Sequence, residues 1–191
     1  GLGDVYKRQV FVVNVMRSAG IPARPVYVPR WSHCDDNHAW VEVWCDGDWH
    51  YLGACEPEAV LDKGWFTNAA SRAMMIGSRW YDRAMPDEKV IGKDGMNRII
   101  NLLGKYAKTR WITITVEDLD GTPAAGAKVR AEVMNYGEFS PIAIMEADKN
   151  GCISFETGFG SLLICAVYDG AYGEKVIDTR AVSYTHLRAH E

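Results

Sequence analysis

An alternating stretch at residues 38–44 constrains the fold of this chain more than any other feature. Every second residue from Ala39 to Val43 is small and apolar, whereas the residues between them, beginning with His38 and ending with Trp44, are aromatic or charged. Successive side chains of a strand point to opposite faces of its sheet. The period of two therefore predicts a β-strand with two chemically distinct faces.

The turn that follows this strand decides which residue lies opposite His38. Asp46-Gly47 is a strong turn signal, and Trp49–Leu52 is predicted to return as the second strand of a hairpin. A three-residue loop places His38 opposite Glu56, on the same face of the sheet. A two-residue loop places it opposite Cys55 instead, so the turn alone leaves two alternatives.

A helix is predicted before the hairpin. Within Val10–Gly20, the residues Phe11, Val15 and Ala19 recur at helical spacing, which predicts one buried face. The glycine at the end of this stretch and Pro22 just beyond it are typical of a helix C-terminus. We therefore expect the last turns of a buried helix here.

Composition limits the class of protein. The 191 residues suit one large domain or two small ones, and 48% hydrophobic with 24% charged residues predicts a folded chain. The net charge of −4 argues against binding nucleic acid through its phosphates. No apolar run reaches the roughly 20 residues that span a bilayer, so no membrane span is predicted. No cofactor is predicted either.

The cysteines are few and scattered. Their odd number and the absence of a C-x-x-C pair argue against a disulfide framework and against a zinc ribbon, which leaves the redox compartment open. The five are Cys34, Cys45, Cys55, Cys152 and Cys165.

Both ends of the chain differ from their neighbours. Gly1–Gln9 and Ala181–Glu191 resemble library adapter sequence that has been translated, so we set both aside as foreign and expect the natural protein to continue in both directions. The alternative is a pair of genuine, poorly ordered tails. Without these segments, the remaining histidines are His33, His38 and His50.

The second half of the chain has a different pattern. Short apolar segments separated by turn signals predict an antiparallel β-sandwich without an active site. The predicted strands are Trp111–Val116, Ala127–Met134, Ile142–Glu146, Cys152–Phe155 and Leu162–Tyr168. We therefore expect a core at residues 10–85, a connection at residues 86–109 and a sandwich domain at residues 110–180, between tails at residues 1–9 and 181–191.

Four segments near the alternating strand follow one another in a specific order. They are Met16–Arg24 (MRSAGIPAR), Asn37–Trp44 (NHAWVEVW), Asp46–Trp49 (DGDW) and Cys55–Pro57 (CEP). This order resembles that of transglutaminase-like proteins. The resemblance implies an α+β fold, with a partial papain-like core in which a helix packs on an antiparallel sheet, followed by the all-β sandwich. It also implies acyl transfer or amide hydrolysis through a thioester.

The resemblance assigns catalytic roles to two residues. His38 matches the base, and the family's carboxylate directly before a proline selects Glu56 over Cys55 as the group that orients it, although the family more often has Asp there. A base of this kind holds a cysteine as its thiolate, and its partner fixes the imidazole tautomer. The family's nucleophile lies about fifteen residues before Gly20, which is Val5 here, so the predicted catalytic set lacks its cysteine.

Other interpretations of the same residues remain. His38 is alternatively a structural strand histidine, and Cys34 is an alternative nucleophile four residues before it. His33, Cys34, Asp35, Asp36 and His38 suggest a metal site, but their spacing matches no usual zinc pattern, and no metal is predicted. Cys45 and Cys55 are interpreted as small buried hydrophobes. The tryptophans are predicted to line the core or cleft, or else to form a carbohydrate-binding platform.

The functional hypothesis has two forms. In the first, the chain is a fragment of a transglutaminase-like cysteine enzyme acting on a protein or peptide, including a glycopeptide because peptide N-glycanases share this core. In the second, it is a non-catalytic module that binds peptide or glycan. The stretch from Ile112 to Val129 resembles prealbumin-like and carboxypeptidase-regulatory-like modules, which implies support or adhesion. The resemblance favours a periplasmic or cell-surface location.

Overall fold

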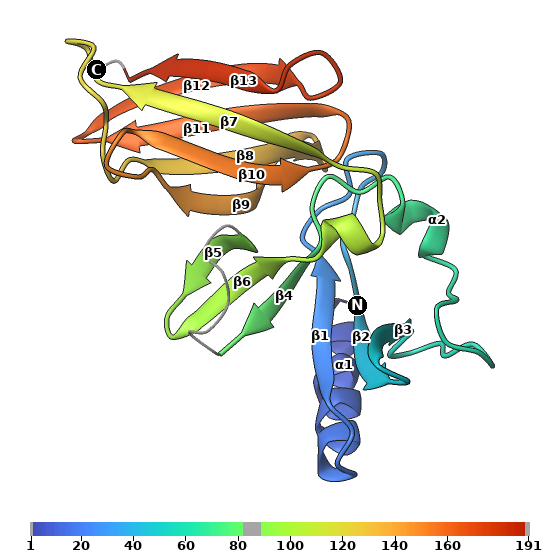
Figure 1. Ribbon diagram of the computed structural model, residues 1–191. Helices are drawn as coiled ribbons and strands as arrows, with labels where there is room; N and C mark the ends of the chain where they lie inside the picture. The colour runs from blue at the N-terminus through green and yellow to red at the C-terminus, as the bar shows by residue number, and fades with distance from the viewer. Residues whose placement is uncertain (1, 82–88, 190–191) are drawn as a thin grey trace.

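The computed structural model describes residues 2–81 and 89–189, which form three β-sheets and two α-helices (Figure 1). The boundary predicted at residues 85 and 86, the first three residues of the predicted connection (86–88), and His190 lie outside the described residues. The helices are α1 (Leu2–Ser18) and α2 (Thr67–Ala70), and a 3₁₀ turn covers Leu103–Lys105. No helix in this part of the chain is long and apolar enough to cross a membrane.

The first sheet has six strands in the order β3-β2-β1-β4-β6-β5, and all of its pairings are antiparallel. Its strands are β1 (Ala23–Val28), β2 (His38–Cys45), β3 (Asp48–Leu52), β4 (Gly77–Trp80), β5 (Val90–Asp94) and β6 (Asn97–Asn101). The strand predicted from alternation is therefore β2, and its predicted partner is β3.

The predicted α+β fold class, with a partial papain-like core, is wrong. The protein is mostly β, with 48% of residues in strands and 12% in helices, and it is sandwich-like overall. The error arises between Asn68 and Lys108, a stretch with no clear periodicity. That stretch contributes β4, β5 and β6, which no pattern in the sequence predicted, so the first sheet is larger than expected.

The hairpin register also differs from the favoured prediction. Cys45 pairs with Asp48, so the loop is the two-residue Asp46-Gly47 and the expected three-residue loop is wrong. Both turn residues have positive φ, 51° and 86°, which is the backbone shape of the turns that match strand twist in short hairpins. Glycine adopts this shape without steric cost, and aspartate is among the residues that tolerate it.

Helix α1 packs on β1 and β2 (Figure 1). Val13, at 5% exposure, joins Ala23 and Val41 in a small apolar cluster. Phe11 and Val15, which the helical spacing placed on the buried face, are 68% and 47% exposed, so that part of the prediction is wrong. The face that contacts the sheet instead carries Val13, and Val12 and Met16, the apolar residues beside the predicted stripe, pack against the same cluster.

The other two sheets lie face to face in the sandwich-like C-terminal region (Figure 1). One has the order β10-β7-β13 and the other β12-β11-β8-β9. Their strands are β7 (Arg110–Glu117), β8 (Lys128–Asn135), β9 (Glu138–Glu146), β10 (Cys152–Thr157), β11 (Ser161–Tyr168), β12 (Ala171–Asp178) and β13 (Tyr184–Arg188). Each of the five predicted strands corresponds to one of these.

The two segments set aside as foreign take part in these elements. Residues 2–9 form the first half of α1, and the side chain of Gln9, which is 3% exposed, donates to the carbonyl oxygens of Val26 and Trp40. Strand β13 pairs in parallel with β7. The foreign origin of both segments, like the domain boundaries, stays a prediction.

Candidate functional site

A cavity of about 330 Å³ lies where β2 begins, and His38 is the first residue of that strand. Four parts of the chain enclose it: α1, the segment before β2, the segment after β3, and the segment before α2. The side chains that matter most for its chemistry are Tyr6, Asn37, His38, Cys55, Glu56 and Trp65. Both predicted catalytic residues, His38 and Glu56, therefore line one cavity.

Aromatic rings surround His38. Its ring centroid lies 4.6 Å from that of Trp65, 4.9 Å from that of Phe66 and 6.0 Å from that of Trp40. Burial among these rings lowers the pKa of His38, while the negative charges of Glu56 and Asp36 partly oppose that shift. The imidazole is therefore neutral at neutral pH, which is the state a general base requires.

Glu56 contributes charge rather than a hydrogen bond. It is exposed, and no hydrogen bond joins it to the ring of His38, both of which lie in the described part of the chain. A tight turn brings it back to the cavity: a Cβ added to the buried Gly53 would lie 2.8 Å from the carbonyl oxygen of Glu56. Only glycine allows the two backbones to approach so closely, so Gly53 determines where Glu56 lies at the cavity.

Sequence reasoning missed two cavity residues, Tyr6 and Asn37. Tyr6 comes from α1, within the segment set aside as foreign, and burial raises the pKa of its phenol. Trp65 was predicted to line the core or cleft, and it lines the cavity with 61% of its surface exposed. Asn37 directly precedes the base, and its buried Oδ1 has no hydrogen-bond partner among the described residues. Adjacency to His38 was the only sequence signal for Asn37.

The remaining predicted candidates lie in different places. Cys55 lines the cavity, whereas Cys34 is exposed and does not line it, and Cys45 ends β2 at the opposite end from His38. The ring of His33 is tilted against that of Trp31 at a centroid distance of 5.5 Å, and His33 does not line the cavity. Within residues 2–81 and 89–189, no group of three or more metal-ligating side chains is arranged to hold an ion.

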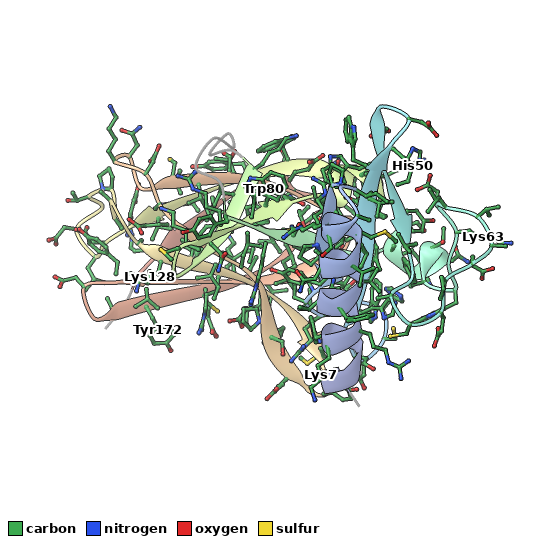
Figure 2. All side chains as sticks on the ribbon, turned by 90° about the horizontal axis from the view of Figure 1, so that it is seen from below. Lys7, His50, Lys63, Trp80, Lys128 and Tyr172 are labelled. Carbon is green, nitrogen blue, oxygen red and sulfur yellow. The ribbon has the colours of Figure 1, made fainter. Side chains whose placement is uncertain are left out.

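A second histidine–carboxylate pair lies on β3. Nδ1 of His50 is 2.5 Å from Oδ2 of Asp62, and the backbone N–H of Tyr51 donates to the other carboxylate oxygen. The hydrogen bond to Asp62 raises the pKa of His50. For Asp62, the hydrogen bonds from His50 and Tyr51 outweigh burial and lower the pKa. Figure 2 shows His50 and the neighbouring Lys63 at the end of the molecule away from the sandwich residues Lys128 and Tyr172.

The His50–Asp62 pair is structural in this setting. It does not line the His38 cavity, and the hydroxyl of Tyr51 and the backbone of Asp62 add further bonds between β3 and the segment after it. These contacts close the loop of residues 53–62, which carries Glu56. The His50–Asp62 pair therefore stabilises the loop whose residues 53–56 line the cavity, although the pair itself does not line it.

A buried polar network stands behind the cavity on β2. The carboxylate of Glu42, which is fully buried, is 2.5 Å from Nε of Arg24 and also accepts a hydrogen bond from the Tyr106 hydroxyl. That hydroxyl accepts in turn from Nε1 of Trp40 at 3.0 Å. Burial and the negative charge of Glu42 raise the pKa of Tyr106. The network fixes the ring of Trp40, one of the rings against His38.

The comparisons with known proteins agree with part of this picture. Residues 1–54 match the family described as "Transglutaminase-like superfamily", a span that includes His38 and ends before Glu56. No curated protein matches the chain. Among solved structures, the chain is similar to one titled "Structure of the Streptococcal ancillary pilin", at 9% identity and a TM-score of 0.33. That alignment covers 88% of this chain and 56% of the other, about half its length.

Proposed function

We propose that the His38 cavity is the base-bearing part of a cysteine-dependent acyl-transfer or amide-hydrolysis site acting on a protein or peptide. The observation that carries the proposal is the meeting of a neutral imidazole, a carboxylate and α1 at one cavity of about 330 Å³. The match of residues 1–54 to transglutaminase-like proteins supports the same chemistry. His38 is the proposed base, and Glu56 is the proposed carboxylate partner, which acts on the free site through its charge and would orient the ring once a hydrogen bond forms.

The proposed reaction needs a thiol beside His38. The thiolate attacks the amide carbonyl, the C–N bond breaks, and the imidazolium returns its proton to the leaving amine. Water or a second amine then attacks the thioester and gives a proton to His38, and the C–S bond breaks to release the thiolate, to which His38 can return the proton. In this scheme neither the base nor its orienting group replaces the nucleophile.

The chain as it stands should lack this activity. Helix α1 has no cysteine, and Cys55 is the one cysteine among the described residues that lines the cavity. Counting from Gly20 places the family's nucleophile at position 5, next to Tyr6, whose side chain lines the cavity. We therefore propose α1 as the element that presents the thiol.

Restoring the thiol tests the proposal directly. We expect Val5→Cys, or Tyr6→Cys, to incorporate a fluorescent primary amine into a glutamine-containing peptide and to release ammonia. Adding His38→Ala to the active variant should reduce turnover by about 10²–10⁴-fold, the usual contribution of a general base. The Cys34→Ala protein serves as a matched control, because Cys34 lies outside the cavity.

Three outcomes would overturn the assignment. Turnover by the unaltered chain that disappears in Cys55→Ala would make Cys55 the nucleophile, whereas loss in Cys34→Ala would make it Cys34. If neither α1 variant shows turnover while both fold normally, the cysteine-enzyme proposal fails.

One observation favours a second candidate, a non-catalytic module that binds peptide or glycan. Trp65 is 61% exposed and stands against His38 at the cavity, as an aromatic binding surface would. A titration of tryptophan fluorescence with a glutamine-containing peptide and with a chito-oligosaccharide separates the two ligand classes. Saturable quenching that is lost in Trp65→Ala, with no turnover in the α1 variants, would favour this candidate.

A further inference from the structure

The turn between β8 and β9 reaches out of the sandwich to the segment that leads into His38. Asn135, at the end of β8, is 1% exposed, although its side chain is a polar amide. Its Nδ2 lies 2.9 Å from the carbonyl oxygen of Trp31, 3.1 Å from that of Cys34 and 3.3 Å from that of Asp36. One side chain therefore contacts three carbonyls of a single short segment.

The side-chain amide of Asn135 forms hydrogen bonds with backbone groups of residues 31–36 through both its nitrogen and its oxygen. Its Oδ1 also accepts from the backbone N–H of Asp36 at 3.3 Å, so both ends of the amide are used. The next residue adds a fifth bond, because the backbone N–H of Tyr136 donates to Oδ1 of Asp35 at 2.6 Å. Asparagine suits this position because it carries a donor and an acceptor on one rigid plane.

The segment held in this way is strained. Asp36 has a φ of 102°, which is unfavourable for any residue other than glycine, and such backbone persists where surrounding contacts impose it. The segment also closes on itself, since the backbone N–H of Trp31 donates to the carbonyl oxygen of Asp36 at 3.0 Å. Residues 36–38 then run directly into the cavity lining.

We propose that Asn135 is a positioning residue for the His38 cavity, so that the sandwich sets the geometry of the site without touching it. Its role in catalysis rests on the proposed function, whereas its effect on the cavity wall does not. Asp36, Asn37 and His38 form that wall, and the contacts of Asn135 fix the backbone immediately before it. The sandwich is then part of the site's support rather than an independent appendage.

The test compares two variants of the sandwich. Asn135→Ala removes all four contacts of the amide. Asp148→Ala is the matched control, because Asp148 caps the turn at the other end of β9, where its Oδ1 accepts from the N–H groups of Asn150 and Cys152. Both substitutions remove side-chain-to-backbone hydrogen bonds from a sandwich turn, but only the first faces the His38 segment.

Two readouts separate positioning from general destabilisation. In Asn135→Ala we expect amide exchange at Asp36 and Asn37 to rise at least about tenfold, with Asp148→Ala unchanged there. We also expect the NMR-measured pKa of His38 to move up toward its ordinary value. Burial is the largest cause of the lowered pKa of His38, so a looser cavity wall should raise that pKa. The wall's movement can also weaken the effect of Asp36, which raises the pKa, but that effect is smaller than that of burial. The charge of Glu56 continues to raise the pKa of His38.

Several results decide the matter. Unchanged exchange and unchanged His38 titration in Asn135→Ala, or equal changes in Asp148→Ala, would overturn the proposal. If Asn135→Ala does not fold, Asp35→Ala breaks the bond to Tyr136 from the exposed side and should give a smaller change in the same direction. Because these readouts need no turnover, inactivity of Val5→Cys would count against the proposed function and not against this inference.

Discussion

The two regions of the molecule bury their interiors differently. A large apolar cluster fills the sandwich, where it includes Ile114, Phe155 and Ile164, and it extends to Met74 and Ile91 of the N-terminal region. The N-terminal region contains a buried ion pair between strands β1 and β2, Arg24–Glu42. Among the ion pairs between described residues, it is the one in which both side chains are less than a tenth exposed. The buried asparagine of the sandwich instead serves the junction with the other region.

This contrast separates shape from charge. The stability that an apolar core provides depends on filled volume, so exchanges between side chains of similar shape cost little. The stability of a buried charge depends on its oppositely charged partner, so removing that partner costs much more. The region with the buried ion pair is also the region with the candidate site. Its network orients Trp40 against His38, so the charges there hold a cavity wall as well as a fold.

The largest expected effect comes from neutralising the buried carboxylate without changing its size. Glu42→Gln leaves Arg24 buried without its charged partner. We therefore expect the free energy of unfolding, measured in urea, to fall by about 3–5 kcal/mol relative to the unaltered protein. Asp178→Asn is the control, since Asp178 forms its ion pair with Arg180 in the open. An unchanged midpoint for Glu42→Gln would show that the two regions do not differ as described.

A smaller effect tests the contact between the regions. A Cβ on Gly158 would lie 2.2 Å from the carbonyl oxygen of Ala73, where the backbone N–H of Gly158 donates to Met74. Gly158→Ala should destabilise the protein by about 1–3 kcal/mol, as overpacking usually does. Gly104→Ala is the comparison, because a Cβ there would lie 3.2 Å from the side-chain carboxylate of Glu156, and its nearest neighbours would be atoms of that side chain and not of the backbone. Equal effects of both would mean that the close approach is unimportant.

A conservative change in the sandwich core should cost less again. Ile164 is fully buried in the apolar cluster, and Ile164→Val removes one methylene group without introducing polarity. We expect a loss of about 0.5–1.5 kcal/mol in the free energy of unfolding, measured in urea. A loss of stability as large as that of Glu42→Gln would mean that the apolar core and the buried ion pair do not differ in their sensitivity to substitution.

The sequence predicted the strands that carry strong alternation and missed those that do not. β2 and the five sandwich strands have clear apolar faces, so their existence follows from periodicity. β4 and β5 are four and five residues long and include Gly77 and Gly92, which pack closely against Ile99. Strands this short, with glycine facing a neighbour, leave no period to detect.

The candidate site was predicted in part for a similar reason. Motif order brought His38 and Glu56 to attention, and both line the cavity. The expected opposition of the two across the hairpin failed, because Asp46-Gly47 closes a two-residue turn and β3 ends at Leu52. Asn135 was beyond prediction, since its contacts join residues about a hundred positions apart and no local pattern records such a distance.

The smallest expected effect is a pH dependence from the exposed His50–Asp62 pair, which closes the loop that carries Glu56. The raised pKa of His50 adds stability that is fully present below the histidine's ordinary value of 6.5 and is lost as pH rises through the folded value. The lowered pKa of Asp62 adds stability that is present above its ordinary value of 3.8 and is lost as pH falls through the folded value. The pair therefore contributes most between those ordinary values.

Asp62→Asn should consequently destabilise the protein more at pH 5.5 than at pH 8.5, because the charge of His50 is lost as pH rises through its folded pKa. Urea midpoints at the two pH values measure the difference, and His50→Gln should remove the same pH dependence. Because this pair is exposed, its effect should stay below that of Ile164→Val. A pH-independent loss in Asp62→Asn would mean that the hydrogen bond from Tyr51, and not the charge of His50, holds the loop.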